Sequence, residues 1–477
     1  MPMRDARPGP RSASAGPGRA QSAAATGVAD ASESGVRQWS IAAAKVIACL
    51  VLPLAGPAAG SGVYLLLAVW ALGGPRRSIE ALTLTWLLNA LNPGVYSISP
   101  QSGILRWVVI AAAILSVFVA VVRHPGRLPR TIHWLWGFGA VAAGLSLLVS
   151  YAPDVSLFKI VIFVTGASAI LMAFHLTRDQ GDCWRRWFLT LSAVFCLASL
   201  PLIVSPVGYL VNGTGFQGLT YHPQTYGVFL APFVAWLPVL VLTETDARVR
   251  RWFLIPLLTI AIVSLVATQA RTGVLAAGAA LALIAARSLS RQGIGMWVRL
   301  LVSTILLLPV CAIVIWLNWE SVNQAAMGFV LKREGVSDVS EAFYQSRGGG
   351  LEVLLQNFTA HPWTGIGFGV SSNPATLVVE RDPFIGLPIS APVEKGFTLF
   401  AVLEEVGIPG FLVFCGLVGS TLAPLLAGTV TAPTAFGVAA ILTNFGEAML
   451  FALSGNGLLV WLLIGAARAM KSSETVA

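Results

Sequence analysis

The chain contains about fourteen apolar stretches, and several approach the roughly 20 residues that an α-helix needs to cross a bilayer. Lipid offers no hydrogen-bond partners to the backbone, so such stretches favour helices. The expected spans are residues 39–55, 58–73, 79–94, 104–122, 132–150, 156–176, 187–206, 226–243, 253–269, 272–287, 299–318, 397–418, 432–452 and 454–469. Hydrophobic residues make up 56% and charged residues 11% of 477 positions. The sequence therefore predicts an all-α, polytopic membrane bundle of about 12–14 helices rather than soluble domains.

Basic residues gather in alternate loops between these spans. The groups are Arg76 and Arg77; Arg123, Arg127 and Arg130; Arg178, Arg185 and Arg186; Arg248, Arg250 and Arg251; Arg287 and Arg291; and Arg468 and Lys471. This pattern follows the positive-inside rule and accounts for the net charge of +9, so it gives no reason to expect nucleic acid as a partner. We expect a disordered cytoplasmic tail at 1–37, a transmembrane bundle at 38–470 and a cytoplasmic tail at 471–477.

The longest polar segment, residues 319–396, is expected as a large loop on the outer face of the membrane. A connection of this length is more often functional than idle. Apolar residues from Leu351 to Phe358 recur at helical spacing, which predicts a short amphipathic helix on the membrane surface or on the bundle. Pro362 disfavours helix at His361. Residues 363–369 follow as a tight turn punctuated by glycine, since no strand precedes them as in a dinucleotide-binding motif.

Three basic residues on the expected outer side are candidates for binding an anion. Arg271 opens the span at 272–287 and has small neighbours, which leave its guanidinium room to turn toward a cavity. Arg347 precedes three glycines and the amphipathic helix, and Lys395 stands just before the span at 397–418. For Arg271 the alternative is that its side chain reaches lipid headgroups.

The order of several motifs resembles the O-antigen ligase and polymerase superfamily. The motifs are Arg-Thr-Gly at 271–273, Ser-Arg at 346–347, His-Pro-Trp-Thr-Gly-Ile-Gly-Phe-Gly at 361–369, Leu-Glu-Glu-Val-Gly-Ile-Pro-Gly at 403–410, and Phe216 followed by Tyr-His-Pro-Gln at 221–224. The resemblance covers about residues 200–470 and rests on the order and spacing of the motifs.

The resemblance implies a metal-independent glycosyltransferase at the outer face of the bacterial inner membrane. It would move a glycan from an undecaprenyl diphosphate carrier to a hydroxyl of a glycan or lipid-linked acceptor, beside polysaccharide-assembly proteins. Arg271 and Arg347 match arginines that hold the diphosphate in that family. A guanidinium suits this role because it binds phosphate oxygens bidentately and stays charged. No nucleotide or other cofactor is implied, and no Cys and His spacing suggests a metal site.

The sequence departs from the family where many ligases carry a His-Asn pair, because it has Glu394, Lys395 and Gly396 there. Glu394 is predicted as the general base, since a carboxylate at the edge of an apolar site can have its pKa raised. Lys395 would help to hold acceptor or diphosphate. The alternative is a simple interfacial ion pair between the two. The departure favours a polymerase or ligase-like relative over a lipopolysaccharide ligase.

His222 lies in a short polar loop and is the second candidate for the general base. The secondary candidates for the site are His361, Tyr221, Gln224, Glu405 and Glu447. Tyr221 and Gln224 could bind sugar hydroxyls, and His361 has the alternative of simply ending a helix. The two acids fall within or near apolar spans, where ionisable residues are usually functional or bridge helices.

Two other functions remain open at this point. A secondary transporter that exports polysaccharide or small molecules should show paired halves with broken helices at matching positions. The sequence shows no convincing repeat, and its polar residues are concentrated in one asymmetric outer loop. A non-catalytic membrane scaffold is the third possibility, but it gives no reason for the positions of Arg271 and Arg347.

Overall fold

The protein is an α-helical membrane bundle. The computed structural model describes residues 37–97, 101–126, 128–211, 213–292, 349–381, 386–393, 395–429 and 431–474. Within them, eight helices are long and apolar enough to cross a membrane: Arg37–Ala55, Ser102–Arg123, Arg130–Val149, Pro153–Leu176, Arg178–Val204, Pro223–Thr243, Ala247–Ala267 and Thr398–Leu426. Helix length and hydropathy thus make the chain a multi-pass membrane protein.

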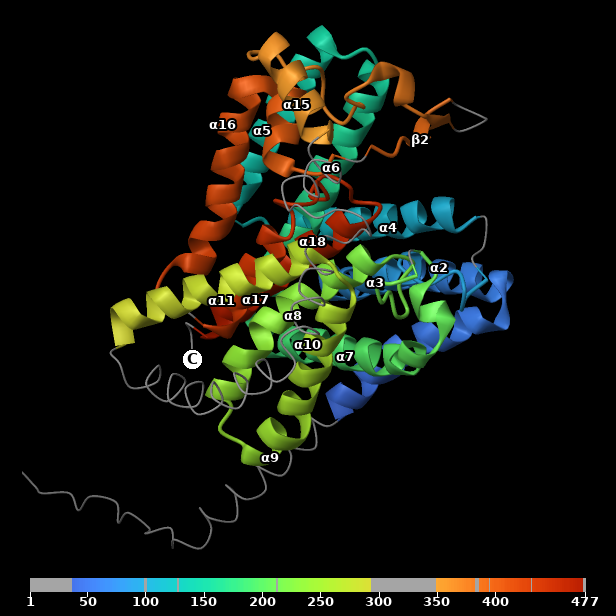
Figure 1. Ribbon diagram of the computed structural model, residues 1–477, viewed down its shortest axis with the longest axis vertical. Helices are drawn as coiled ribbons and strands as arrows, with labels where there is room; N and C mark the ends of the chain where they lie inside the picture. The colour runs from blue at the N-terminus through green and yellow to red at the C-terminus, as the bar shows by residue number, and fades with distance from the viewer. Residues whose placement is uncertain are drawn as a thin grey trace, which may run out of the picture.

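The labelled elements run in the order seen in Figure 1, after a first helix that begins at Arg37. They are α2 (Pro57–Ala71), α3 (Pro75–Asn89), α4 (Ser102–Arg123), α5 (Arg130–Val149), α6 (Pro153–Leu176), α7 (Gly181–Ser199), α8 (Pro223–Thr243), α9 (Ala247–Val249), α10 (Ile255–Ala267), α11 (Arg271–Gln292), α15 (Gly349–Ala360), α16 (Thr398–Leu426), α17 (Ala432–Leu442) and α18 (Asn456–Glu474). Two short antiparallel strands, β1 (Glu380–Arg381) and β2 (Pro388–Ser390), pair within the long loop.

Several helices begin at residues that favour a helix start. Helices α2, α3, α6 and α8 each open with a proline, whose missing N–H and preset φ suit the first turn. Helix α8 is largely buried and packs against α10, α11 and α17. Helices α6 and α16 start beside the long loop. The starts of α8 and α11 contact the turns at 443–455, which bond to Lys395 of the loop and lead into α18. We call this end of the bundle the loop end.

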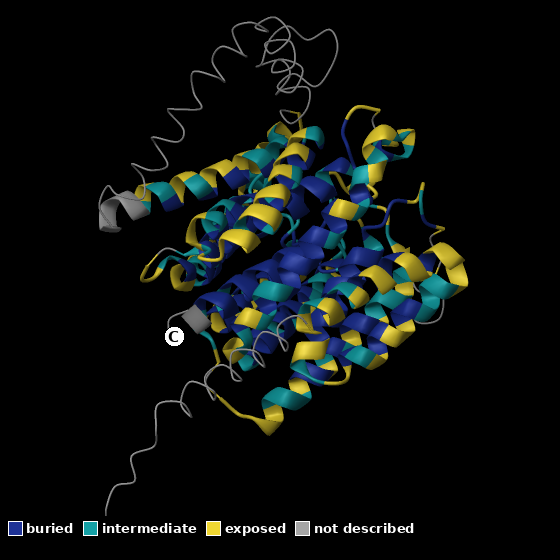
Figure 2. Cartoon of the chain, turned by 90° about the horizontal axis from the view of Figure 1, so that it is seen from below, coloured by how far each residue is buried: buried dark blue, intermediate teal, exposed yellow. Residues whose placement is uncertain are grey.

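Large apolar side chains lie on the outside of the bundle as well as in its core. For example, Leu148 of α5 is 79% exposed and Val69 of α2 is 70% exposed. Figure 2 shows buried residues in the interior and exposed ones along the outer faces of the helices. A bilayer removes this outer apolar surface from water, so the distribution agrees with a membrane protein.

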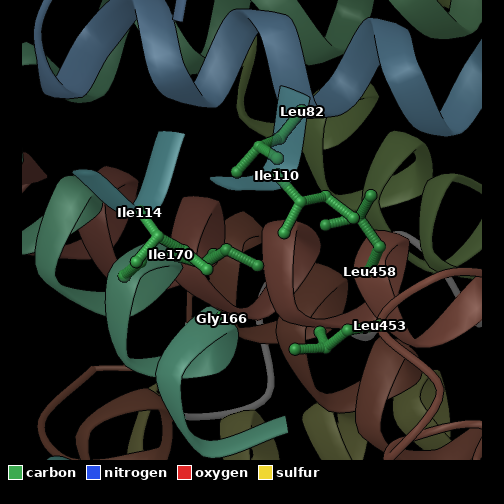
Figure 3. Close-up of a pocket in the computed structure, with 8 residues that line it drawn as sticks. Leu82, Ile110, Ile114, Gly166, Ile170, Leu453 and Leu458 are labelled. Carbon is green, nitrogen blue, oxygen red and sulfur yellow. The ribbon is translucent and has the colours of Figure 1, made fainter. Parts of the chain in front are cut away.

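A small cavity between α3, α4, α6 and α18 has a volume of about 10 Å³. Its walls are aliphatic, as Figure 3 shows for Leu82, Ile110, Ile114, Gly166, Ile170, Leu453 and Leu458. A space of this size holds at most one water molecule, which would find no polar partner there. The cavity is therefore a packing defect and no ligand site.

The expected span at 432–452 is wrong beyond Leu442, where α17 ends. Residues 443–455 form turns before α18 begins. Asn444 helps to end α17, because its Nδ2 donates to the carbonyl of Ala440 at 2.9 Å. Irregular backbone inside a bundle is tolerated where protein groups satisfy it.

Some expectations lie outside the described residues. They are the span at 299–318, the candidate site residues Arg347 and Glu394, and nearly all of the N-terminal tail, of which only Arg37 is described. At the other terminus, α18 continues to Glu474 and so enters the segment expected as a tail.

Candidate functional site

The amphipathic helix predicted in the long loop is present as α15. It packs against α16 and buries Leu354, which is 4% exposed (Figure 1). The helix ends at Ala360 because Pro362 disfavours helix at the residue before it. His361 follows the helix, and its side chain is exposed. Its position fits a residue that ends a helix.

Helix α16 is broken at Gly407, which has φ 58° and ψ −168°. Pro409 lies two residues later and has no N–H to donate to the carbonyl of Glu405. The break therefore leaves backbone carbonyls of the preceding turn without their helical donors. Buried carbonyls require other partners.

The turn at residues 361–369 supplies those partners. Three backbone hydrogen bonds join it to the opened turn of α16: Ile366 N to Glu404 O at 2.9 Å, Gly367 N to Glu405 O at 3.0 Å, and Ile408 N to Pro362 O at 2.8 Å. The two motifs that the sequence carries about 40 residues apart, at 361–369 and 403–410, thus interlock backbone to backbone.

Two glycines permit this close approach. Gly365 has φ 65°, and a Cβ there would lie 2.4 Å from the carbonyl carbon of Glu405. Gly367 has φ 108°, and a Cβ there would lie 2.5 Å from the Cβ of Ser150. Neither the backbone conformation nor the space accommodates a larger residue.

Replacing Gly367 with alanine is expected to destabilise the protein by about 2–3 kcal/mol, because it adds both a strained φ and a clash. Gly386 is the matched control, since it has φ 70° but no atom of the described residues within 4 Å of the point where a Cβ would lie. Gly386→Ala should cost about 1 kcal/mol, from strain alone. Thermal unfolding in detergent measures both, and equal losses would contradict the docking role of Gly367.

Phe368 anchors the same turn in the bundle. Its side chain is 1% exposed and packs edge-on against Phe138 and Phe451, with ring centroids 5.9 and 5.1 Å away. Its backbone N–H donates to Ser146 Oγ at 2.9 Å, and Lys159 Nζ donates to the carbonyl of Gly369. The loop is therefore fastened to α5 and α6 as well as to α16.

A buried ionic cluster lies beneath the loop, and we call it the Lys395 cluster. Lys395 Nζ lies 2.7 Å from Glu404 Oε2 and 2.9 Å from Glu405 Oε1. Asn357 Nδ2 and Ser372 Oγ also donate to the Glu404 carboxylate, at 2.6 and 3.1 Å. Burial disfavours the charged lysine, but the carboxylates of Glu405 and Glu404 outweigh it and raise the pKa of Lys395.

The cluster joins α15, the loop and α16 through five side chains: Asn357, Ser372, Lys395, Glu404 and Glu405. Two carboxylates already surround the Lys395 ammonium. We therefore assign Lys395 to holding the loop in place rather than to binding diphosphate. Glu405 takes part in the same ion pairs, as expected of a helix-bridging acid.

A second group of predicted residues meets beside this cluster, where the first turns of α8 and α11 touch. A Cβ on Gly227 of α8 would lie 2.2 Å from the Cβ of Ala270, directly before Arg271. A Cβ on Gly446 would lie 2.6 Å from Thr272 Cγ2, directly after Arg271. The 443–455 turns thus press against the start of α11, which begins at Arg271.

His222 caps α8, because its Nδ1 accepts a hydrogen bond from Gln224 N at 3.1 Å. Gln224 Nε2 in turn donates to Glu447 Oε1 at 3.3 Å. The next residue, Ala448, donates its N–H to the carbonyl of Lys395 at 3.1 Å. These bonds connect α8, the 443–455 turns and the Lys395 cluster in one network.

Most of the predicted site residues thus meet at the loop end. They are His222, Gln224, Arg271, Lys395, Glu405 and Glu447. Tyr221 is 41% exposed, and its ring centroid is 6.4 Å from that of His222. His361 stays on the surface beyond α15.

Sequence reasoning missed Glu404, Asn357 and Ser372. Glu404 is fully buried. In the sequence it stands next to a second acid, Glu405, and the residue pattern does not show which of the two is buried more deeply. Asn357 lies among the apolar positions of α15, and its contact with Glu404 spans 47 residues. Only the docking of the loop on α16 identifies these residues.

No protein-family model matches the chain, and no curated protein matches it. In the part of the chain that the structure describes, no group of three or more His, Cys, Asp or Glu side chains is placed to hold a metal ion.

Proposed function

We propose that this protein is a membrane glycosyltransferase of the polymerase or ligase type. It transfers a glycan from an undecaprenyl diphosphate carrier to a hydroxyl acceptor at the outer face of the inner membrane. One observation supports this above all others: the start of α11 at Arg271 touches the start of α8, where His222, Gln224 and Glu447 form a hydrogen-bonded chain.

The physical argument concerns the anion that leaves during transfer. The starts of α8 and α11 each carry the partial positive charge of a helix N-terminus, and Arg271 adds a full charge. A diphosphate gains negative charge as the glycosidic bond breaks. Groups that are positive before the reaction starts therefore lower the energy of the transition state. Arg347, which lies outside the described residues, is the proposed second arm of this clamp.

The proposed chemistry is a direct displacement with inversion. The acceptor hydroxyl attacks the anomeric carbon opposite the diphosphate, a base takes the hydroxyl proton, and the lipid diphosphate leaves with the bonding electrons. Glu394 remains the proposed base. Glu447, which Gln224 holds by a hydrogen bond, is the second carboxylate for this role.

His222 is better suited to donating a hydrogen bond than to taking a proton. Because Nδ1 accepts from Gln224 N, a neutral ring carries its proton on Nε2. Nε2 can then donate to a sugar or phosphate oxygen. This geometry changes the role that the sequence alone suggests for His222, which is that of a second candidate base.

Substitutions at His222 separate this role from helix capping. Asparagine can also cap a helix, so His222→Asn should leave thermal stability nearly unchanged and lower turnover by about 100-fold. His222→Ala should lower turnover similarly and also cost about 1 kcal/mol of stability. Wild-type turnover in His222→Asn would restrict this residue to capping.

The deciding experiment reconstitutes the purified protein in lipid nanodiscs with undecaprenyl diphosphate-linked glycan. The expected result is release of undecaprenyl diphosphate together with glycan growth or transfer. No turnover with the native donor and acceptor would contradict the proposal. Broken helices also occur in transporters, and α16 is broken here at Gly407. Proteoliposomes therefore provide a second readout: glycan movement without release of lipid diphosphate would favour transport.

A further inference from the structure

A second cavity lies at the opposite end of the bundle from the candidate site. Its volume is about 380 Å³, within the range of small-molecule sites. It is lined by the ends of α6, α16 and α18 and is open on one side. These helices all start at the loop end, so the cavity opens at the end where the basic loops gather.

The charged groups that line this cavity are all basic. Arg178, Arg468 and Lys471 line it together with His175, and no aspartate or glutamate of the described chain does. Among the described residues, no carboxylate lies within ion-pair distance of Arg178 or Arg468. The cavity is therefore a place of concentrated positive charge.

Uncharged acceptors help to hold the basic residues in place. Arg468 Nη1 donates to Thr131 Oγ1 at 2.9 Å. Lys471 Nζ donates to the carbonyls of Leu425 and Thr429 and to Thr434 Oγ1, so its three N–H groups already have acceptors. The Thr131 hydroxyl orients the Arg468 guanidinium but does not neutralise it. Arg178 is exposed at the mouth of the cavity. An anion that enters would meet prearranged donors.

The remaining wall is apolar and includes Leu171 and Phe174, both buried. A ligand with a charged head and an apolar body matches such a combination. We propose that the cavity binds a phosphate group through Arg178 and Arg468, and that an anionic phospholipid supplies it. Basic pockets between membrane helices are suited to such headgroups. A soluble phosphate ester shares the head chemistry but would leave the apolar wall uncovered.

The test titrates short-chain fluorescent phosphatidylglycerol into the full-length protein in a zwitterionic detergent. Arg178→Gln and Arg468→Gln should each weaken binding about fivefold. Arg248→Gln is the matched control, because Arg248 is an exposed basic residue in another basic loop and does not line the cavity. Its affinity should equal that of the wild type. Melting temperatures without lipid verify that each variant folds. If Arg468→Gln does not fold, Arg178→Gln decides the test, because Arg178 is exposed and its removal does not disturb the core.

Competition distinguishes the two sources of phosphate. Millimolar inorganic phosphate or glycerol phosphate should not displace the lipid if the apolar wall contributes to binding. If inorganic phosphate or glycerol phosphate displaces the lipid from the wild type but not from the two cavity variants, the site binds a soluble phosphate ester. That outcome would overturn the assignment to a phospholipid. Equal affinity in the wild type, both cavity variants and the control would overturn the proposal.

Discussion

Replacing Lys395 with methionine is expected to destabilise the protein by about 3–5 kcal/mol, the cost of removing one partner from a buried ion pair. Methionine matches the length of the lysine stem but leaves Glu404 and Glu405 buried without a counter-charge. The side chains of these acids are only 0% and 8% exposed, so water cannot take over. Thermal or denaturant unfolding in detergent measures the loss.

Two comparisons identify the cause. Adding Glu404→Gln and Glu405→Gln to Lys395→Met should recover part of the stability, because the uncompensated charges disappear. Arg381→Gln removes the ion pair with Asp154, whose side chains lie 2.6 Å apart but are 46% and 48% exposed. Solvent screens that pair, so its loss should cost less than about 1 kcal/mol. Equal costs for Lys395→Met and Arg381→Gln would contradict the cluster's structural role.

The pH dependence provides an independent readout of the same cluster. Because the folded protein raises the pKa of Lys395, the stability that this lysine contributes is complete below its unfolded pKa of about 10.4. It is lost as the pH rises through the higher folded-state value. Above about pH 10.4, the wild type should therefore lose stability more steeply than Lys395→Met.

Replacing Arg271 with alanine is expected to lower glycan transfer by about 10²–10³-fold, because the leaving diphosphate loses a charged donor in the transition state. Arg271→Lys should be intermediate, since it keeps the charge but loses the two-pronged geometry of the guanidinium. Turnover of undecaprenyl diphosphate-linked glycan in nanodiscs is the measurement. Full activity in Arg271→Ala would remove the basis of the proposed function.

Arg381→Ala is the control for this prediction. Arg381 is also a basic residue of the loop end, but it lies on the exposed strand β1 and pairs with Asp154 at the start of α6. Its removal should leave turnover unchanged. A similar loss in both variants would indicate a general electrostatic effect of the loop end rather than a clamp at the start of α11.

The sequence predicts the membrane bundle and α15 because these depend on local patterns. A run of apolar residues near 20 positions long favours a spanning helix wherever it occurs. The spacing from Leu351 to Phe358 likewise predicts an apolar face of α15 before any partner is known, and Leu354 of this face is buried. The sequence could not predict that α17 stops at Leu442, because residues 443–455 remain apolar enough to continue a span. Their turns are held by contacts with distant segments, such as that of Ala448 with Lys395.

Residue chemistry alone identified Arg271 and His222 as candidates, since charge and proton affinity belong to the side chain. Their arrangement depends on tertiary structure: the starts of α8 and α11 meet through a glycine and an alanine more than 40 residues apart. The same holds for Lys395, which sequence alone assigns to an anion and the fold places between two carboxylates. Which group pairs with a charged side chain depends on the distances between segments of the folded chain. Burial makes those distances decisive, because few other groups remain near enough to compensate a buried charge.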